Sequence, residues 1–100
     1  MLEIFEKRRF SDNVIHLKGE LVRENAGEFK KKLMERIERN GSRVTVLDLW
    51  ELDFVDSVGL GAMVDIAEKM RKRELTLKIS RVNPDIKKVL SNVHLGHLLT

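Results

Sequence analysis

The sequence predicts a single α/β domain over residues 1–100, with helices packed on a mixed β-sheet of about four strands in the order β-β-α-β-α-β-α. A length of 100 residues suits one domain. The composition, 42% hydrophobic and 35% charged, is that of a globular protein. Apolar residues recur at every second position in some segments, as in a strand, and at every third or fourth position in others, as in a helix. No repeat or linker interrupts this pattern, so we expect no domain boundary.

The chain is expected to begin with a β-hairpin. Residues 2–8 alternate between apolar and charged side chains, which is typical of a strand at the edge of a sheet. A turn cluster follows at residues 11–13. Residues 14–18 then form a second strand that ends near Gly19. Because the connection is short, the two strands should pair antiparallel.

A helix is predicted to begin at Glu24. Apolar residues recur at spacings of three and four, which places on one helical face Ala26, Phe29, Leu33 and Ile37. Asn40 and Gly41 provide the left-handed stop that is common after a helix.

Residues 44–50 predict a central strand, since they are rich in β-branched side chains and almost continuously apolar. Such strands are usually buried on both faces. After a short link and Phe54-Val55, a second helix is expected at or immediately after Ser57. Its apolar residues are Leu60, Met63, Val64, Ala67 and Met70. The helix ends in the basic run 71–73, which suits the negative end of a helix dipole.

The last predicted elements are a strand over residues 75–79 and a short helix. Asn83 is a favoured cap, Pro84 suits the first helical position, and Asp85 suits the first turn. The apolar stripe of this helix consists of Ile86, Val89, Leu90 and Val93. Residues 94–100 are apolar enough to dock, but their pattern assigns no element.

Residues 56–61, Asp-Ser-Val-Gly-Leu-Gly, join the central strand to the second helix. The first backbone N–H groups of a helix lack partners within it, and Asp56 or Ser57 can cap them. The same helix end favours a phosphate by about 0.3–1 kcal/mol, and by up to ~2 kcal/mol where it is partly buried. Gly59 and Gly61 each cost about 0.8–1 kcal/mol relative to alanine, which suggests close approach by the protein's own sheet or by a partner. From spacing alone, the simplest interpretation is that Ser57 is only a helix cap.

The segment 54–61, together with the strand Val-Leu-Asp-Leu at residues 46–49, resembles the signature of bacterial anti-sigma factor antagonists of the STAS type. The likeness includes Gly-Glu-Leu at 19–21 and residues 83–90. It implies a single STAS-type domain over nearly the whole chain.

The resemblance also implies a partner-switching cycle. The unphosphorylated protein would bind an anti-sigma factor with serine kinase activity and so release a sigma factor. Phosphorylation of Ser57 would end binding, and a serine phosphatase would reset the cycle, with no cofactor in this chain. The implied partner-binding residues are Glu20, Val22, Asp56, Ser57, Val58, Gly59, Leu60 and Gly61. Val22 stands where the family commonly has an Asp associated with partner contact, which leaves the identity or strength of the interaction open.

Two other functions remain open from the sequence. A STAS domain can serve as a scaffold in a signalling complex or as a regulatory subunit of a transporter, without a sigma-factor role. A serine hydrolase is disfavoured because a nucleophile elbow needs Gly where Val55 stands, although candidate bases exist in His16, His94 and His97. Two histidines three residues apart are too few for a structural zinc site. We therefore expect no enzyme activity and no metal.

Charge and hydropathy bear on partners and location. The net charge is +3 and the pI is near 9.4, but the basic clusters are mostly interleaved with acids and aromatic residues are few. We therefore expect no nucleic-acid binding. No apolar run approaches the ~20 residues that span a bilayer, and cysteine is absent, so we expect a cytoplasmic protein without membrane insertion. The resembling family usually continues through a further helix beyond the position of Thr100, and a shorter end would leave an apolar surface open to a partner or to a second copy, which would allow a dimer.

Overall fold

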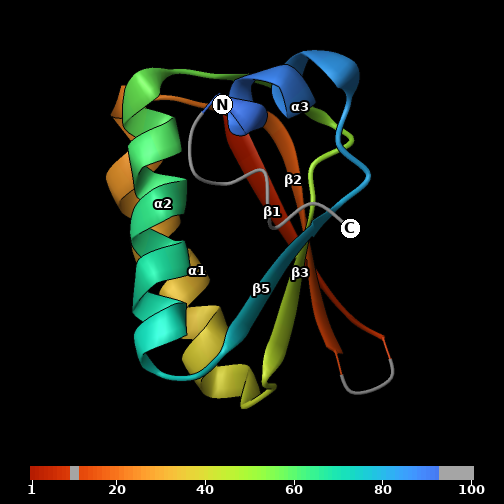
Figure 1. Ribbon diagram of the computed structural model, residues 1–100, viewed down its shortest axis with the longest axis vertical. Helices are drawn as coiled ribbons and strands as arrows, with labels where there is room; N and C mark the ends of the chain where they lie inside the picture. Colours follow the sequence, from red (N-terminus) through yellow and green to blue (C-terminus); the bar gives the residue numbers. More distant parts are fainter. Residues whose placement is uncertain (10–11, 93–100) are drawn as a thin grey trace.

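The computed structural model describes residues 1–9 and 12–92, which form one mixed sheet and three helices (Figure 1). The element order is β-β-α-β-β-α-β-α. The elements are β1 (Leu2–Arg9), β2 (Asp12–Leu21), α1 (Arg23–Asn40), β3 (Val44–Asp48), β4 (Leu52–Val55), α2 (Ser57–Lys72), β5 (Thr76–Ser80) and α3 (Pro84–Ser91). The predicted single α/β domain with a mixed sheet is confirmed, with one strand more than expected.

The sheet has the order β1-β2-β3-β5, and β4 pairs with β2. β1 and β2 form the predicted antiparallel hairpin. β3 lies parallel to the first part of β2, from Asn13 to His16, and β5 lies parallel to β3. β4 lies parallel to the last part of β2, from Gly19 to Leu21. Strands β2, β3, β4 and β5 therefore end at the same end of the sheet.

The prediction that the second strand ends near Gly19 was wrong. At Gly19 the register of the ladder shifts, and the strand continues to Leu21. The backbone of Gly19 has φ +108°, and a Cβ there would collide with the carbonyl oxygen of Met1, so glycine is required. The extra length of β2 pairs with β4, a strand of four residues that the sequence pattern did not predict.

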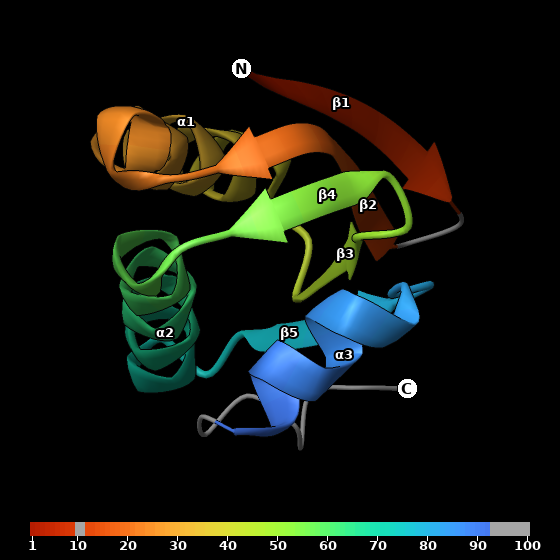
Figure 2. The ribbon, with the colours of Figure 1, turned by 90° about the horizontal axis from the view of Figure 1, so that it is seen from above.

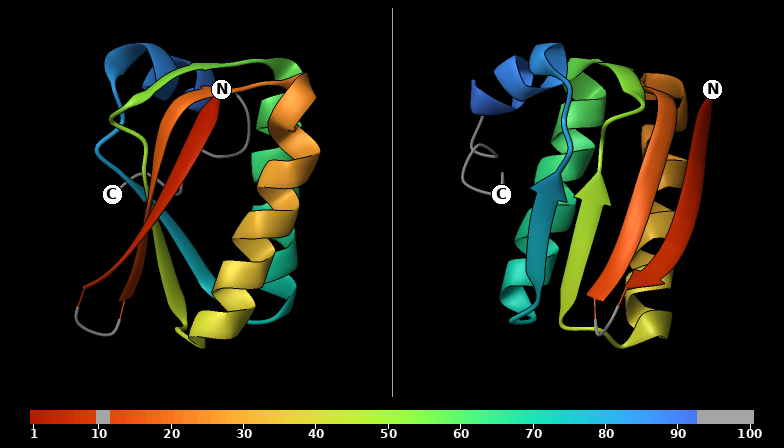
Figure 3. Two further views of the ribbon diagram at one scale, coloured as in Figure 1. Left: turned by 180° about the vertical axis from the view of Figure 1, so that it is seen from behind. Right: turned by 90° about the vertical axis from the view of Figure 1, so that its right-hand side faces the viewer.

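Helices α1 and α2 lie side by side on one face of the sheet, and α3 lies across the end at which the parallel strands finish (Figures 2 and 3). The core is the layer between the two long helices and the sheet. Its fully buried large side chains are Ile15, Leu17, Leu21, Phe29, Leu33, Leu47, Leu49, Leu52, Met63, Ile66, Met70 and Ile79. The sheet therefore sets the orientation of both long helices.

The expectation that residues 44–50 form a central strand buried on both faces is confirmed only in part: β3 lies between β2 and β5, and Asp48 on the face away from the helices is buried. The strand β3 ends at Asp48, and the side chain of Trp50 beyond it is 53% exposed. Thr45 and Leu47 face the helices and are buried, whereas Val46 on the other face is half-buried. Both long helices pack on the same face, so among residues 1–9 and 12–92 no helix covers the opposite one.

Helix α1 buries the four side chains that the sequence predicted, Ala26, Phe29, Leu33 and Ile37. It ends as predicted at Gly41, with φ +73°. The stripe predicted for α2 was only partly right. Met63 and Met70 are buried, but the stripe is completed by Gly59, Ala62 and Ile66, while Leu60, Val64 and Ala67 are half-buried. The buried face of α2 is rotated from the predicted one because α2 packs against both the sheet and α1.

The cap predicted for α3 is present. The Asn83 side chain accepts a hydrogen bond from the Ile86 N–H at 3.0 Å, and Pro84 occupies the first turn. The Asn83 amide also donates to the Leu52 carbonyl at 2.8 Å, which joins α3 to β4. Ile86 and Leu90 are buried as expected and Val89 is half-buried. Val93, the last residue of the predicted stripe, and the segment 94–100 lie outside the described residues.

Two polar side chains inside the sheet have no hydrogen-bond partner among the residues that the structure describes. Asn13 of β2 and Thr45 of β3 are paired across the strands and are almost fully buried. Neither the Asn13 amide nor the Thr45 hydroxyl makes a hydrogen bond within the described part of the chain. A buried hydroxyl without a partner costs free energy, because it has lost its bonds to water.

We therefore expect Thr45→Val to raise the free energy of unfolding by about 1 kcal/mol, since valine has the same shape without the hydroxyl. Urea unfolding followed by circular dichroism measures the change. Thr76→Val, at an exposed position on the paired strand β5, is the control and should have little effect. A loss of stability in Thr45→Val would instead mean that the hydroxyl is bonded to a buried water.

Candidate functional site

The candidate site lies where β2 and β4 end and where α1 and α2 begin (Figure 1). The two strands are parallel neighbours, with Leu21 paired with Val55. Each strand therefore delivers the chain to a helix at the same end of the sheet. In open α/β sheets, the region beyond the carboxyl ends of the strands is where ligands usually bind.

The Asp56 carboxylate joins the first turns of both helices. Its Oδ1 accepts a hydrogen bond from the Gly59 N–H at 2.8 Å, and its Oδ2 accepts one from the Arg23 N–H at 2.9 Å. The Asp56 N–H donates to the Leu21 carbonyl at 3.2 Å. The bonds from Gly59 and then from Arg23 hold the pKa of Asp56 below its ordinary value of 3.8. One ionised side chain thus caps α2 and stabilises the start of α1.

Ser57 is not the cap of α2, so the simplest interpretation of the sequence was wrong. Asp56 occupies the cap position, and Ser57 is the first residue of the helix. The side chain of Ser57 is exposed. Because the neighbouring carboxylate already satisfies the first turn, the fold does not require a hydroxyl at Ser57. The site therefore presents a serine at the positive end of a helix with its oxygen accessible.

The two glycines of this turn have different surroundings. A Cβ on Gly59 would collide with the carbonyl oxygen of Leu21 and crowd the side chain of Val55. Gly59 is buried, and the close approach expected there is made by the protein's own strand β2. A Cβ on Gly61 would meet nothing within 4 Å, and Gly61 is exposed. The fold accounts for the first glycine but not for the second.

The other residues implied by the resemblance lie at the same end of the molecule. Glu20 is exposed and pairs with Phe54 of β4. Val22 is the half-buried cap residue of α1, and its side chain has no oxygen. Its carbonyl accepts a hydrogen bond from the Asn25 N–H at 3.0 Å, and its own N–H donates to the Asn25 side chain at 2.9 Å. The Arg23 N–H is bonded instead by Asp56. The structure thus brings Glu20 and Val22 beside residues 56–61.

Within the segment 56–61, the residues differ in exposure. Ser57, Val58 and Gly61 are exposed, Asp56 and Leu60 are half-buried, and Gly59 is buried. Ser57, Val58 and Gly61 therefore form the accessible surface, and Asp56, Gly59 and Leu60 pack beneath it. The role of this set in partner binding stays a prediction.

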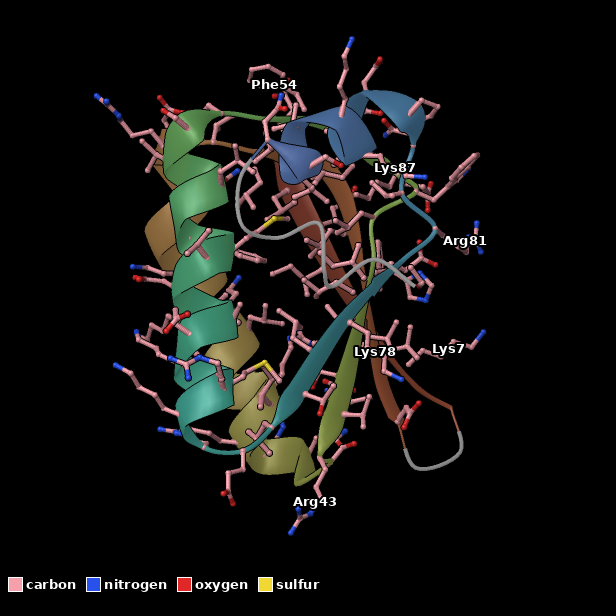
Figure 4. All side chains as sticks on the ribbon, in the orientation of Figure 1. Lys7, Arg43, Phe54, Lys78, Arg81 and Lys87 are labelled. Atoms are coloured by element: carbon pink, nitrogen blue, oxygen red, sulfur yellow. The ribbon has the colours of Figure 1, made fainter. Side chains whose placement is uncertain are left out.

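Sequence reasoning missed several exposed residues beside the site. Phe54 is 52% exposed and Val58 is 38% exposed, and Figure 4 shows Phe54 projecting from the end of the molecule where α2 begins. Arg23 and Gly27 of α1 lie across a hollow from α2. Large exposed apolar side chains often mark interaction surfaces, but the exposure of Phe54 depends on the packing of β4 and could not be read from the sequence. The α1 residues could be placed only by the packing of the two helices.

A second hollow, of about 620 Å³, lies on the face of the sheet away from α1 and α2. There the buried carboxylate of Asp48 is 3.2 Å from Nδ1 of His16 and 3.6 Å from Nε of Arg81. Figure 4 shows Lys7, Lys78 and Arg81 projecting on that side. His16 is thus a sheet residue paired with Asp48.

The other histidines considered in the sequence, His94 and His97, lie outside the described residues. Within the described ranges, no group of three or more His, Asp or Glu side chains is arranged to hold a metal ion. Two of the basic clusters, residues 30–32 and 71–73, are interleaved with acids as expected, in pairs that join Lys30 to Asp65, Lys32 to Glu28, Arg71 to Glu68 and Arg73 to Glu38. None of the helices described is both long and apolar enough to cross a membrane.

The fold and the Asp56-Ser57 turn at the start of α2 agree with a known family. A model of the STAS domain matches residues 5–100. The chain belongs to the STAS domain family. As a STAS domain it is 29% identical over 73 residues to a protein of Bordetella bronchiseptica named "Putative anti-sigma factor antagonist BtrV". That match covers 73% of this chain but 62% of BtrV, less than two thirds of its length.

Solved structures share the STAS fold at lower identity. The anti-sigma factor antagonist SpoIIAA in its unphosphorylated form superimposes with a TM-score of 0.80 and 19% identity, covering all of this chain and 86% of SpoIIAA. An anti-sigma factor antagonist from Mycobacterium paratuberculosis gives 0.84 and 18%, covering 99% and 83%. A sulfate transporter family protein from Wolinella succinogenes gives 0.75 and 17%, covering 93% and 79%. These likenesses establish the fold.

The different surroundings of the two glycines predict opposite effects on stability. Gly59→Ala should lower the free energy of unfolding by about 1–3 kcal/mol, because its methyl group must displace the backbone of β2. Gly61→Ala should raise it by about 0.8–1 kcal/mol through helix propensity. Chemical unfolding measures both changes. Equal effects at the two positions would contradict the close contact between Gly59 and Leu21.

The capping carboxylate predicts a pH dependence. The pKa of Asp56 is lower in the folded chain than in the unfolded one, so the stability that it contributes is present above about pH 4 and is lost as the pH falls below its folded value. Asp56→Asn should therefore unfold at a lower temperature at pH 7 and show a smaller further decrease between about pH 4 and 2. Thermal melts measure this. Asp53→Asn, an exposed position on β4, is the control, and identical pH profiles for Asp56→Asn and the wild type would refute the prediction.

Proposed function

We propose that this STAS domain is an anti-sigma factor antagonist whose binding to an anti-sigma factor ends when Ser57 is phosphorylated. The observation that carries the proposal is the exposed Ser57 at the first position of α2, with Asp56 as the cap in its place. The hydroxyl is accessible to a kinase and is not needed by the fold. The relationship to BtrV, whose name describes a putative anti-sigma factor antagonist, supports the same role.

The proposed surface combines the residues implied by the resemblance with the exposed Phe54. Val58 and Phe54 supply apolar area, and Ser57, Glu20 and Val22 surround them. Aromatic side chains are common anchors of protein interfaces. An anti-sigma factor with serine kinase activity would cover this surface and then modify the serine beneath it. In that step the γ-phosphoryl group of ATP passes to Ser57 Oγ, ADP leaves, and the kinase takes the hydroxyl proton.

Local charge is sufficient for the proposed switch. Phosphorylation adds about −1.5 to −2 charge at neutral pH. The positive end of α2 tolerates that charge in the free protein, so the fold is retained. In a packed interface the same group must lose its water beside the ionised Asp56. A penalty of ~2.8 kcal/mol already weakens binding about a hundredfold.

The remaining features of the cycle follow as proposals. The kinase uses ATP and the sigma factor acts on transcription, so we place the cycle in the bacterial cytoplasm. A serine phosphatase restores the free hydroxyl. We assign no enzyme activity, cofactor or nucleic-acid binding to this chain. The sulfate transporter family protein of similar fold favours one alternative, a STAS scaffold or regulatory subunit of a transporter without a sigma-factor role.

The first experiment is incubation with ATP and a purified anti-sigma kinase from the same genome, followed by intact-mass spectrometry. We expect the gain of one phosphate that maps to Ser57 and is absent in Ser57→Ala. Ser80→Ala removes the hydroxyl at the end of β5 and serves as the control. Absence of phosphate while the kinase modifies another substrate would favour the scaffold or transporter role.

Binding to the same kinase gives a second prediction. Ser57→Asp should bind about a hundredfold more weakly than the wild type, because a fixed negative charge enters the interface. Ser57→Ala should bind as well as the wild type and remain bound in the presence of ATP. Calorimetry measures both, and circular dichroism checks that both variants are folded. Wild-type affinity in Ser57→Asp would contradict the switch.

A further inference from the structure

Strand β1 forms an edge of the sheet that has no neighbouring strand. Within residues 1–9 and 12–92, β1 pairs only with β2, and Figures 2 and 3 show it as the outermost strand. It is eight residues long and runs beside β2 without a shift in register. An edge strand of this length presents a row of backbone N–H and C=O groups that can pair with another strand.

The bonds between β1 and β2 show which backbone groups point to the free edge. The Glu20 N–H donates to the Met1 carbonyl at 3.1 Å, so Met1 is bonded to β2. Along an antiparallel pair, bonded and non-bonded positions alternate. The odd-numbered residues of β1 therefore direct their backbone groups to β2, and the even-numbered residues within 2–8 direct theirs to the free edge.

The side chains of β1 on the face away from the helices form a charge pattern. Phe5 is 48% exposed and lies midway between an exposed acid, Glu3, and an exposed base, Lys7. Lys18 lies opposite Glu3 on β2, but neither Glu3 nor Lys7 forms an ion pair among the described side chains. The open face of the strand thus presents an acid, an aromatic ring and a base in a row along a free edge.

We propose that β1 pairs antiparallel with β1 of a second copy of this chain, in the register that places the two Phe5 side chains opposite each other on a two-fold axis. In this register Glu3 of each copy faces Lys7 of the other, on the same face of one continuous sheet. The even-numbered residues of the two strands exchange their free backbone hydrogen bonds. Phe5 then occupies a non-hydrogen-bonded position, where opposite side chains approach most closely. Such a dimer does not require the proposed function of Ser57.

The charges of β1 select this register. A pairing shifted by two residues in one direction places two Glu6 side chains opposite each other, and like charges across strands are destabilising. A shift in the other direction places Glu3 opposite Phe5 and leaves Lys7 opposite Met1, outside the strand. A shift by one residue would set the open face of one copy against the helix-covered face of the other. The proposed register alone gives two pairs of opposite charge.

The other free edge within the described part of the sheet does not fit a second copy. Strand β5 has five residues, and its central side chain is the exposed Lys78. A two-fold pair of β5 strands about this residue would oppose two positive charges. The acid, ring and base of β1, in contrast, complement their own reversed order. A second copy therefore matches the edge of β1 in all three side chains.

The proposed dimer leaves the candidate functional site uncovered. β1 lies on one side of β2, and β4, which leads to Ser57, lies on the other. Because the two β1 strands run in opposite directions, the Ser57 turns of the two copies lie at opposite ends of the joined sheet. Each copy can therefore meet a partner independently.

Exchange of the charges tests the register. In sedimentation velocity at several concentrations, the wild type should show an equilibrium between monomer and dimer. Glu3→Lys and Lys7→Glu each set like charges across the interface, so each variant alone should self-associate at least about tenfold more weakly. An equimolar mixture of the two variants restores opposite charges in a heterodimer and should recover the wild-type affinity. Lys78→Glu makes the same charge change on β5 and should have no effect.

An introduced thiol tests the position of the axis, since the chain contains no cysteine. Phe5→Cys should form a disulfide between two copies under mild oxidation, because Cα atoms about 4.5 Å apart at a non-hydrogen-bonded pair are within reach of a disulfide. Glu3→Cys is the control. Its counterpart in the second copy lies roughly 13 Å away along the strand, so it should not cross-link. Circular dichroism checks that every variant is folded.

Each outcome supports or overturns the proposal. A wild type that sediments as a monomer at every concentration overturns it. A mixture of Glu3→Lys and Lys7→Glu that fails to recover the wild-type affinity overturns the register. Cross-linking of Glu3→Cys as complete as that of Phe5→Cys does the same. Self-association that Lys78→Glu weakens and Glu3→Lys does not would assign the contact to a different surface.

Discussion

The geometry of the site depends on the two hydrogen bonds that the Asp56 carboxylate accepts. The bonds come from the first turns of different helices, Arg23 of α1 and Gly59 of α2. They fix both helix starts to the ends of two neighbouring strands, since the Asp56 N–H is itself bonded to Leu21 of β2. The Val22 side chain has no oxygen that could cap α1, so the carboxylate of Asp56, 33 residues after Arg23, accepts a bond from the Arg23 N–H, which would otherwise lack a partner.

Within residues 56–61, the side chains that hold the fold together are different from those that we propose to bind a partner. Asp56 stabilises the helices and Gly59 allows β2 to approach them closely, so these two positions are constrained by the fold. Ser57 and Gly61 are exposed, and neither the hydrogen bonds of Asp56 nor the contact between Gly59 and β2 requires a serine or a glycine at these positions. A phosphate on Ser57 would therefore change the surface while the bonds beneath it persist. That separation is what a charge-operated switch on a rigid domain requires.

The same separation explains how the STAS fold can serve different partners. The fold is shared with proteins under 25% identical, among them an anti-sigma factor antagonist and a sulfate transporter family protein. What differs must then be on the surface, where Phe54, Val58, Gly27 and Gly61 are exposed in this chain. The fold limits where a partner can bind, and the exposed side chains determine which partner is accepted.

The sequence by itself determined the element types, the face that α1 buries, and the caps at Gly41 and Asn83, because these depend on residues three or four apart. It did not show β4, the length of β2 or the exposure of Trp50, since each depends on which strand or helix lies alongside. It identified Ser57 within a turn but could not decide whether Asp56 or Ser57 caps the helix. Only the tertiary structure decided this, because the second bond of Asp56 goes to α1, and because the same packing brings Gly27 opposite Gly61 across one hollow.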